Sequence, residues 1–136
     1  VQIMNKKNSN LIKYIITAVV LIAFLLFNLF GSVKAEIKDE ELVVNSLFKA
    51  ETIKIETIDE IRLIDKFAYG SRVGISTFKI NSGTFTNETY GKYSLMVYKS
   101  VNDHILIRYD DKIIVFNLES ETATQALYQE LLALID

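Results

Sequence analysis

The residues best suited to chemistry lie around the single histidine of this 136-residue sequence, His104. It directly follows Asp103 and shortly precedes the acidic pair Asp110 and Asp111. A zinc site or a Ser-His-Asp triad needs more ligands or a positioned nucleophile, and the sequence has no cysteine, no second histidine and no nucleophile-elbow motif. We therefore expect His104 to be a surface residue at the start of a strand, and we expect no catalytic residue, metal ion or cofactor.

Two short polar motifs favour turns over ligand sites. Asp110 and Asp111 lack the alternating ligand spacing of a calcium loop, and acidic residues tolerate the left-handed backbone of a two-residue hairpin. Residues 87–89 read Asn-Glu-Thr, which matches a glycosylation triplet. Such a triplet is frequent by chance, so we interpret it as a hairpin loop.

Three residues are candidates for contact with a ligand or partner: Tyr69, Arg72 and Tyr90. They fall in or beside segments that we expect to be loops, and loops on a rigid sheet often carry binding residues. Aromatic and arginine side chains also supply much of the energy of protein interfaces. The alternatives are structural: Arg72 pairs with a nearby carboxylate such as Asp65, and Tyr90 forms a corner of the fold.

An uncharged apolar run at residues 14–33 determines where the rest of the chain resides. As a helix it would be about 30 Å long, which matches the hydrocarbon core of a bilayer. Lys6, Lys7 and Lys13 precede it, which predicts a cytoplasmic N-terminus and an extracytoplasmic domain. The run is either an uncleaved anchor, which we favour slightly, or a signal peptide cut after Ala35 to release a secreted protein.

Charge separates this leader from the remainder. All 17 acidic residues lie at or after Glu36, but only 11 of the 15 basic residues do, so the formal charge of this part is −6. A net negative charge argues against a nucleic-acid partner and against binding to an anionic lipid surface, because both favour clusters of lysine and arginine. We expect a cytoplasmic basic N-terminus (1–13), a transmembrane helix or signal-peptide core (14–33), a polar linker (34–41) and one folded domain (42–136).

Hydrophobic periodicity predicts a β-rich domain that ends in a helix. About seven strands are expected, and the segments with a strand-like pattern are 42–44, 52–58, 61–64, 75–80, 84–86, 92–98, 105–109 and 112–117. Residues 45–46 and 81–83 suggest turns or a bulge. Residues 65–74 contain two closely spaced glycines and are expected to be the least regular segment. After Ser120 or Thr122, which can cap a helix, Leu127 and Leu131 recur at helical spacing.

The order and spacing of several motifs in this domain resemble the bacterial pleckstrin-homology-like family. The resemblance spans residues 41–134, and its motif positions, which we take as structural, include Gly70, Gly74, Gly83, Phe85, Gly91, Tyr93, Asn117, Leu127, Tyr128 and Leu131. It implies an α+β, mainly β, PH-like fold of two near-orthogonal antiparallel sheets closed by one C-terminal helix. We also assign Tyr93, Leu95, Leu127 and Leu131 to the core.

The resemblance also implies a binding or scaffolding module with no enzymatic activity. Domains of this kind that bind inositol phosphates use basic residues around the first hairpin, and residues 45–50 here offer only Lys49, so we do not expect phosphoinositide binding. We predict a membrane-tethered module that binds a protein or peptide, for which a sheet edge is suitable. The alternatives are a small-molecule or lipid-headgroup sensor and, less favoured, a secreted enzyme.

Overall fold

The computed structural model describes residues 6–47 and 49–135, which form two units. The first unit contains α1, Lys6–Phe30. Within it, Asn8–Leu26 is by length and composition able to cross a membrane. From Ile15 to Leu26 its only polar side chain is Thr17, so this part of the helix is apolar on all sides. The apolar helix expected at residues 14–33 is present, but it ends at Phe30, and Val33 belongs to the core of the second unit.

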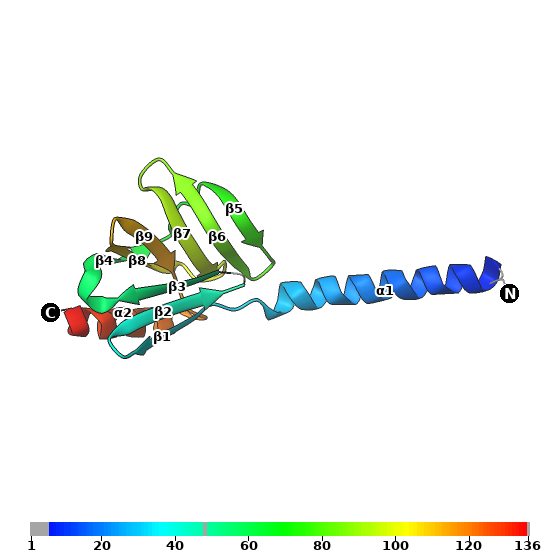
Figure 1. The fold of residues 1–136 in the computed structure, drawn as a ribbon, viewed down its shortest axis with the longest axis horizontal. Coiled ribbons are helices and arrows are strands. Elements are labelled where there is room, and N and C mark those ends of the chain that lie inside the picture. Colours follow the sequence, from blue (N-terminus) through cyan, green and yellow to red (C-terminus); the bar gives the residue numbers. More distant parts are fainter. Residues whose placement is uncertain (1–5, 48, 136) are drawn as a thin grey trace. The chain divides into compact units, whose positions relative to one another are not determined.

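The second unit begins at Gly31 and contains two sheets and one helix (Figure 1). The small sheet is β1 (Lys34–Lys38), β2 (Glu41–Ser46) and β3 (Lys49–Lys54), in that order. A short 3₁₀ turn, Ile55–Thr57, leads into the large sheet. The large sheet consists of β4 (Ile58–Asp65), β5 (Ser71–Ser76), β6 (Ile80–Asn87), β7 (Gly91–Tyr98), β8 (Asp103–Tyr109) and β9 (Lys112–Phe116). The strands of the small sheet cross β5–β7 at a steep angle, as expected for a two-sheet sandwich (Figure 1).

The order of strands in the large sheet is β4-β8-β9-β7-β6-β5. All its neighbouring pairs are antiparallel except β7 and β9, which run parallel over Ser94–Met96 and Ile114–Phe116. The expected purely antiparallel sheet is therefore mixed. The reason is that β8 and β9 form a hairpin that enters the sheet with β9 beside β7, and β8 then pairs with the distant strand β4.

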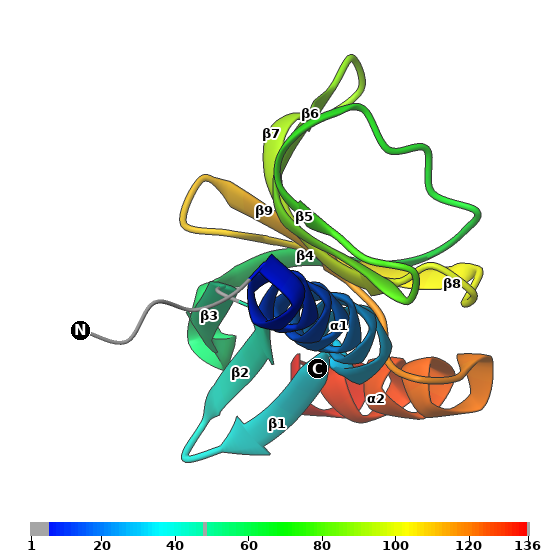
Figure 2. The same ribbon diagram turned by 90° about the vertical axis from the view of Figure 1, so that its right-hand side faces the viewer.

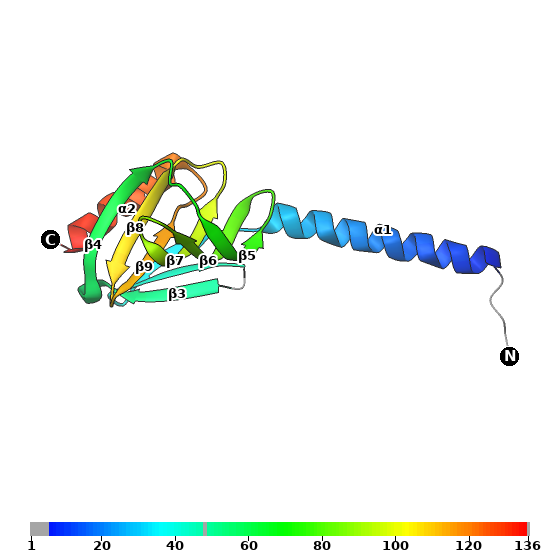
Figure 3. The same ribbon diagram turned by 90° about the horizontal axis from the view of Figure 1, so that it is seen from above.

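Helix α2, Glu121–Ile135, lies along β4 and β8 (Figure 3). Its apolar face places Leu127 and Leu131 in the core between the sheets. Tyr93 and Leu95 are also buried, on the opposite face of the large sheet, so all four expected core residues are confirmed. The helix begins with the capping bond from the Ala123 N–H to the Ser120 hydroxyl, as the sequence predicts.

The segment 34–41 is not a simple polar linker. Residues Lys34–Lys38 form β1, in which Ala35 and Ile37 face the core and alternate with charged residues. Because this segment is so highly charged, its sequence does not readily show the alternation of apolar and polar side chains that is typical of a strand. Asp39 and Glu40 then form a tight turn with φ of 52° and 62°. The Asp110-Asp111 turn has the same left-handed backbone, as expected, with φ of 45° and 59°.

Further boundaries differ from the sequence expectation, and the described residues contain nine strands where about seven were expected. The turn suggested at residues 45–46 is wrong, because these residues end β2 and pair with the start of β3. The strand expected at 52–58 divides into the end of β3, the 3₁₀ turn and the start of β4. The strand expected at 75–80 lies earlier, as β5. Asn81-Ser82-Gly83, expected to be a turn or bulge, is part of β6. Gly83 pairs there with Gly74 of β5, and the two backbones approach too closely for a Cβ atom on either residue.

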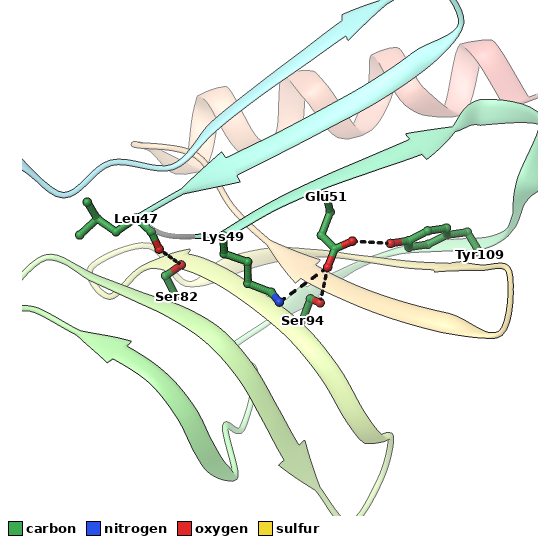
Figure 4. Close-up of polar contacts among 6 residues, drawn as sticks. All are labelled: Leu47, Lys49, Glu51, Ser82, Ser94 and Tyr109. Atoms are coloured by element: carbon green, nitrogen blue, oxygen red, sulfur yellow. Dashed lines mark hydrogen bonds and ion pairs between the residues drawn. The ribbon is translucent and has the colours of Figure 1, made fainter.

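Polar contacts join the two sheets (Figure 4). The Glu51 carboxylate of β3 accepts hydrogen bonds from the Ser94 hydroxyl of β7 at 2.8 Å and from the Tyr109 hydroxyl of β8 at 3.1 Å. Burial, followed by the charge of Glu51, raises the pKa of Tyr109. The Ser82 hydroxyl also donates to the Leu47 carbonyl at 3.1 Å. These hydrogen bonds help to fix the position of the small sheet relative to the large one.

Candidate functional site

The candidate site lies on the outer face of the large sheet, the face turned away from the small sheet. An apolar cluster there consists of Phe67, Phe85, Tyr93, Leu95, Val97, Leu106 and Val115. Phe67 belongs to the connection between β4 and β5, which Figure 2 shows as an arch on one side of the sheet. Its ring packs edge-on against Tyr93 at 5.4 Å, which fixes the connection to the sheet. The segment 65–74, which shows no regular pattern in the sequence, therefore contributes a buried side chain, Phe67, that packs against the sheet.

Tyr69 and His104 form a hydrogen-bonded pair beside this cluster. His104 is buried, contrary to the surface position expected from the sequence, because the β4–β5 connection covers the start of β8. His104 Nδ1 lies 2.6 Å from the Asn102 carbonyl, which can only accept, so Nδ1 carries the proton. Nε2 is then the acceptor for the Tyr69 hydroxyl at 2.7 Å.

Burial has opposite effects on the two pKa values. It lowers the pKa of His104, against the backbone bonds and the neighbouring carboxylates of Asp103 and Asp65, which raise it. It raises the pKa of Tyr69 to about 12. Both groups are therefore neutral near pH 7, which suits a structural bond. Among the residues that the structure describes, no group of three or more histidine or carboxylate side chains is arranged to hold a metal ion.

Tyr90 lies at the centre of a group of charged residues. Its ring stacks on Phe67 with centroids 5.7 Å apart, and the guanidinium carbons of Arg62 and Arg108 each lie 5.6 Å from the ring centroid. Glu60 holds the two arginines, accepting from Arg62 Nε at 2.8 Å and from Arg108 Nε at 2.9 Å. Arg62 also donates to the Tyr90 hydroxyl at 2.8 Å. We call these four residues, Glu60, Arg62, Tyr90 and Arg108, the tyrosine–arginine platform.

Arg72 is exposed on β5, the edge strand of the large sheet. It pairs in register with Phe85 and so shares the outer face with the aromatic cluster. The alternative ion pair with Asp65 is not formed, and Arg72 has no ion-pair partner among the described residues. The structure thus links Tyr69 and Tyr90 through Phe67, and places Arg72 on the same face of the sheet.

The remaining motif residues are structural. Asn117 is fully buried and bonds the end of β7: its Oδ1 accepts from the Tyr98 N–H at 2.7 Å, and its Nδ2 donates to the Tyr98 and Val101 carbonyls at 3.3 Å. Gly91 has φ of 70° in the β6–β7 turn. A Cβ at Gly70 would overlap the backbone of Thr86. Tyr128 packs against the core from α2.

Sequence reasoning did not identify Glu60, Arg62, Arg108 or Phe67. The only local signal was the alternation of charged Glu60 and Arg62 with apolar neighbours in β4. Arg108 joins them because β4 pairs with β8. That pairing brings Glu60 opposite Arg108, 48 residues further along the chain (108 − 60), and a single sequence does not reveal it.

Two concavities border the described surface of the domain. One of about 300 Å³ adjoins the platform and is lined by Asp59, Tyr90, Lys92, Arg108, Asp111, Lys112 and Ile113. A groove of about 630 Å³ lies between the β1–β2 turn, the 3₁₀ turn and the end of α2. Its lining combines apolar and mainly acidic residues: Ile37, Asp39, Glu40, Glu41, Lys54, Ile55, Glu56, Ile58, Leu134 and Ile135.

Two crossed sheets closed by a C-terminal helix define a PH-like domain. The family model described as "Bacterial PH domain" matches residues 33–122, and the chain therefore belongs to the bacterial PH domain family. This match begins at Val33, close to the start of the second unit. No match was found among curated proteins or solved structures.

Proposed function

We propose that this chain is a membrane-tethered, extracytoplasmic module that binds a protein or peptide and carries out no catalysis. The observation that carries the proposal is the tyrosine–arginine platform. Tyr90 is held in place by Phe67, on which its ring stacks, and by the guanidinium groups of Arg62 and Arg108, which lie over its ring. A partner would meet groups whose positions are already set, so little side-chain entropy would be lost on binding.

The composition of the platform also suits a protein interface. Tyrosine and arginine are enriched among residues that dominate interface energy. The side chains of Arg62 and Arg108 are 44% and 41% exposed, so part of each guanidinium group is accessible, although Glu60 occupies both Nε atoms and one terminal nitrogen of Arg62 donates to the Tyr90 hydroxyl. Planar donors of this kind bind carboxylates and backbone carbonyls well.

The start of the domain supports an uncleaved tether. Val33 is 2% exposed, its N–H donates to the Tyr98 hydroxyl at 3.1 Å, and that hydroxyl donates to the Val33 carbonyl at 3.3 Å. Cleavage after Ala35 would remove this core residue and the first two residues of β1. The basic residues before α1 favour a cytoplasmic N-terminus. Intact mass of the membrane-bound protein tests this: a chain that starts at Glu36 contradicts the anchor.

Photocrosslinking in membranes tests the binding role. A photoreactive phenylalanine analogue is placed at Lys112, which borders the platform, and at Thr52, an exposed position on the small sheet, as the control. We expect a discrete crosslinked protein from position 112 only, and we expect Arg108→Ala to abolish it. Equal labelling at both positions, or a product unaffected by Arg108→Ala, contradicts the proposal.

The groove favours a second candidate function, sensing of a small molecule. Its volume of about 630 Å³ is in the range of ligand pockets, and it combines an apolar lining with acidic groups. A cationic amphiphile fits that chemistry. A ligand screen that raises the melting temperature of the wild type but not of Ile55→Glu, together with absence of crosslinks at position 112, would favour this candidate over protein binding.

A further inference from the structure

The chain joins the domain directly beside the β5–β6 turn. A Cβ at Gly31 would lie 3.0 Å from the Ile80 side chain and 3.4 Å from that of Leu47. Ile80 is the first residue of β6 and is fully buried. Gly31 is covalently next to Phe30, the last residue of α1. Wherever α1 points, the surroundings of Ile80 therefore stay close to the end of that helix.

The β5–β6 turn presents an aromatic side chain on a rigid support. Thr77 is 2% exposed, and its hydroxyl oxygen accepts from the N–H groups of Lys79 and Ile80 at 3.2 Å and 3.1 Å. The Thr77 N–H also donates to the Ile80 carbonyl at 2.9 Å. Phe78 stands at the tip with 70% of its surface exposed. A large exposed apolar side chain on such a fixed turn indicates an interaction site.

Basic residues surround this position in a domain whose formal charge is otherwise negative. Lys79 Nζ lies 5.6 Å from the ring centroid of Tyr98, the residue that holds Val33. The Lys99 N–H donates to the Lys79 carbonyl at 2.9 Å. Lys34, next to Val33, is exposed. Three lysines, Lys34, Lys79 and Lys99, thus lie near the start of the domain in sequence or by backbone pairing.

We propose that the β5–β6 turn docks on the bilayer surface, with Phe78 in the interfacial layer and Lys79 and Lys99 at the lipid headgroups. The inference rests on the proposed membrane tether. A helix that spans the bilayer ends near the membrane surface, and Phe78 is two residues from Ile80, at most about 7 Å along the backbone. Aromatic rings and lysines are typical of this layer, where the ring is buried and the ammonium remains solvated.

The sequence contains no tryptophan, so a single introduced tryptophan reports its own surroundings. The full chain is reconstituted in phosphatidylcholine vesicles with one quarter phosphatidylglycerol, with and without bromine on the acyl chains. Phe78→Trp reports the turn. Leu21→Trp, inside α1, reports the tether. Thr89→Trp is the distant control, because it lies beyond the far end of β6, a strand that spans roughly 23 Å at 3.3 Å per residue.

We expect brominated lipid to reduce the fluorescence of Phe78→Trp at least twofold and to leave Thr89→Trp unchanged. A blue-shifted emission should accompany the quenching. Quenching of Leu21→Trp without quenching of Phe78→Trp overturns the docking inference while the tether stands. Absence of quenching at Leu21→Trp overturns the tether itself. Equal quenching at positions 78 and 89 also overturns the inference, because it shows contact without the proposed orientation.

Discussion

Removal of residues 1–35, the result of signal-peptide cleavage after Ala35, should strongly destabilise the domain. The fragment that starts at Glu36 loses Val33 from the core and loses both partners of the Tyr98 hydroxyl. It also loses the strand pairs of Lys34 with Asn45 and of Ala35 with Val44. A fragment that starts at Gly31 keeps all of these contacts and is the matched control.

The magnitude follows from these contacts. Burial of a valine side chain contributes about 1.5–3 kcal/mol. A buried hydroxyl without a partner costs about 1–3 kcal/mol. The free energy of unfolding should therefore fall by about 3–5 kcal/mol, a large fraction of the 5–15 kcal/mol typical of a domain.

Urea unfolding of the two fragments, followed by circular dichroism, measures this difference. We expect the fragment from Glu36 to unfold at a much lower urea midpoint. In the fragment from Gly31, Val33→Ala should account for about 1–2.5 kcal/mol of the loss. Equal midpoints for the two fragments would refute the reasoning and restore cleavage as compatible with a folded domain.

Three further predictions concern the interior of the domain. Asn117→Ala should lower the free energy of unfolding by about 3 kcal/mol, because three hydrogen bonds around Tyr98 are lost, and urea midpoints measure this. Gly74→Ala should cost about 1–3 kcal/mol, since its Cβ overlaps the backbone of β6, whereas exposed Val73→Ala should cost little by the same assay. Burial lowers the pKa of His104 from 6.5, so below that pH the unfolded chain binds a proton more readily than the folded one, and stability should decrease on acidification. His104→Gln should reduce this slope in urea titrations between about pH 5 and pH 7, and an unchanged slope would contradict the assignment.

Local patterns predicted the parts of the fold that depend on local physics. The apolar run, the C-terminal helix, the Asp110-Asp111 turn and the strong strands β7, β8 and β9 all have periodicity or turn residues that determine them. β1 was missed because charged residues outnumber its two inward-facing apolar ones. The position of β5 was missed because its side chains are mostly exposed, so no alternation marks it.

The candidate site was only partly accessible from the sequence. Residue type alone identified Tyr69, Arg72 and Tyr90, and all three lie on the outer face. Their surroundings depend on which strands pair, which decides that Arg62 and Arg108 flank Tyr90. The sequence predicted a surface position for His104, which is wrong. The β4–β5 connection covers this residue, and that connection has no regular structure that a periodic pattern can reveal.

The pairing of β4 with β8 has a consequence for how the domain folds. Residues 58–65 cannot enter the sheet until residues 103–109 are present, and the β1–β3 sheet buries its apolar face only against that completed sheet. Such non-local contacts make folding slow and strongly dependent on chain completion. The sequence contains no proline, so prolyl isomerisation adds no further delay. Refolding should thus be a single slow phase, and a chain truncated before β8 should remain unfolded.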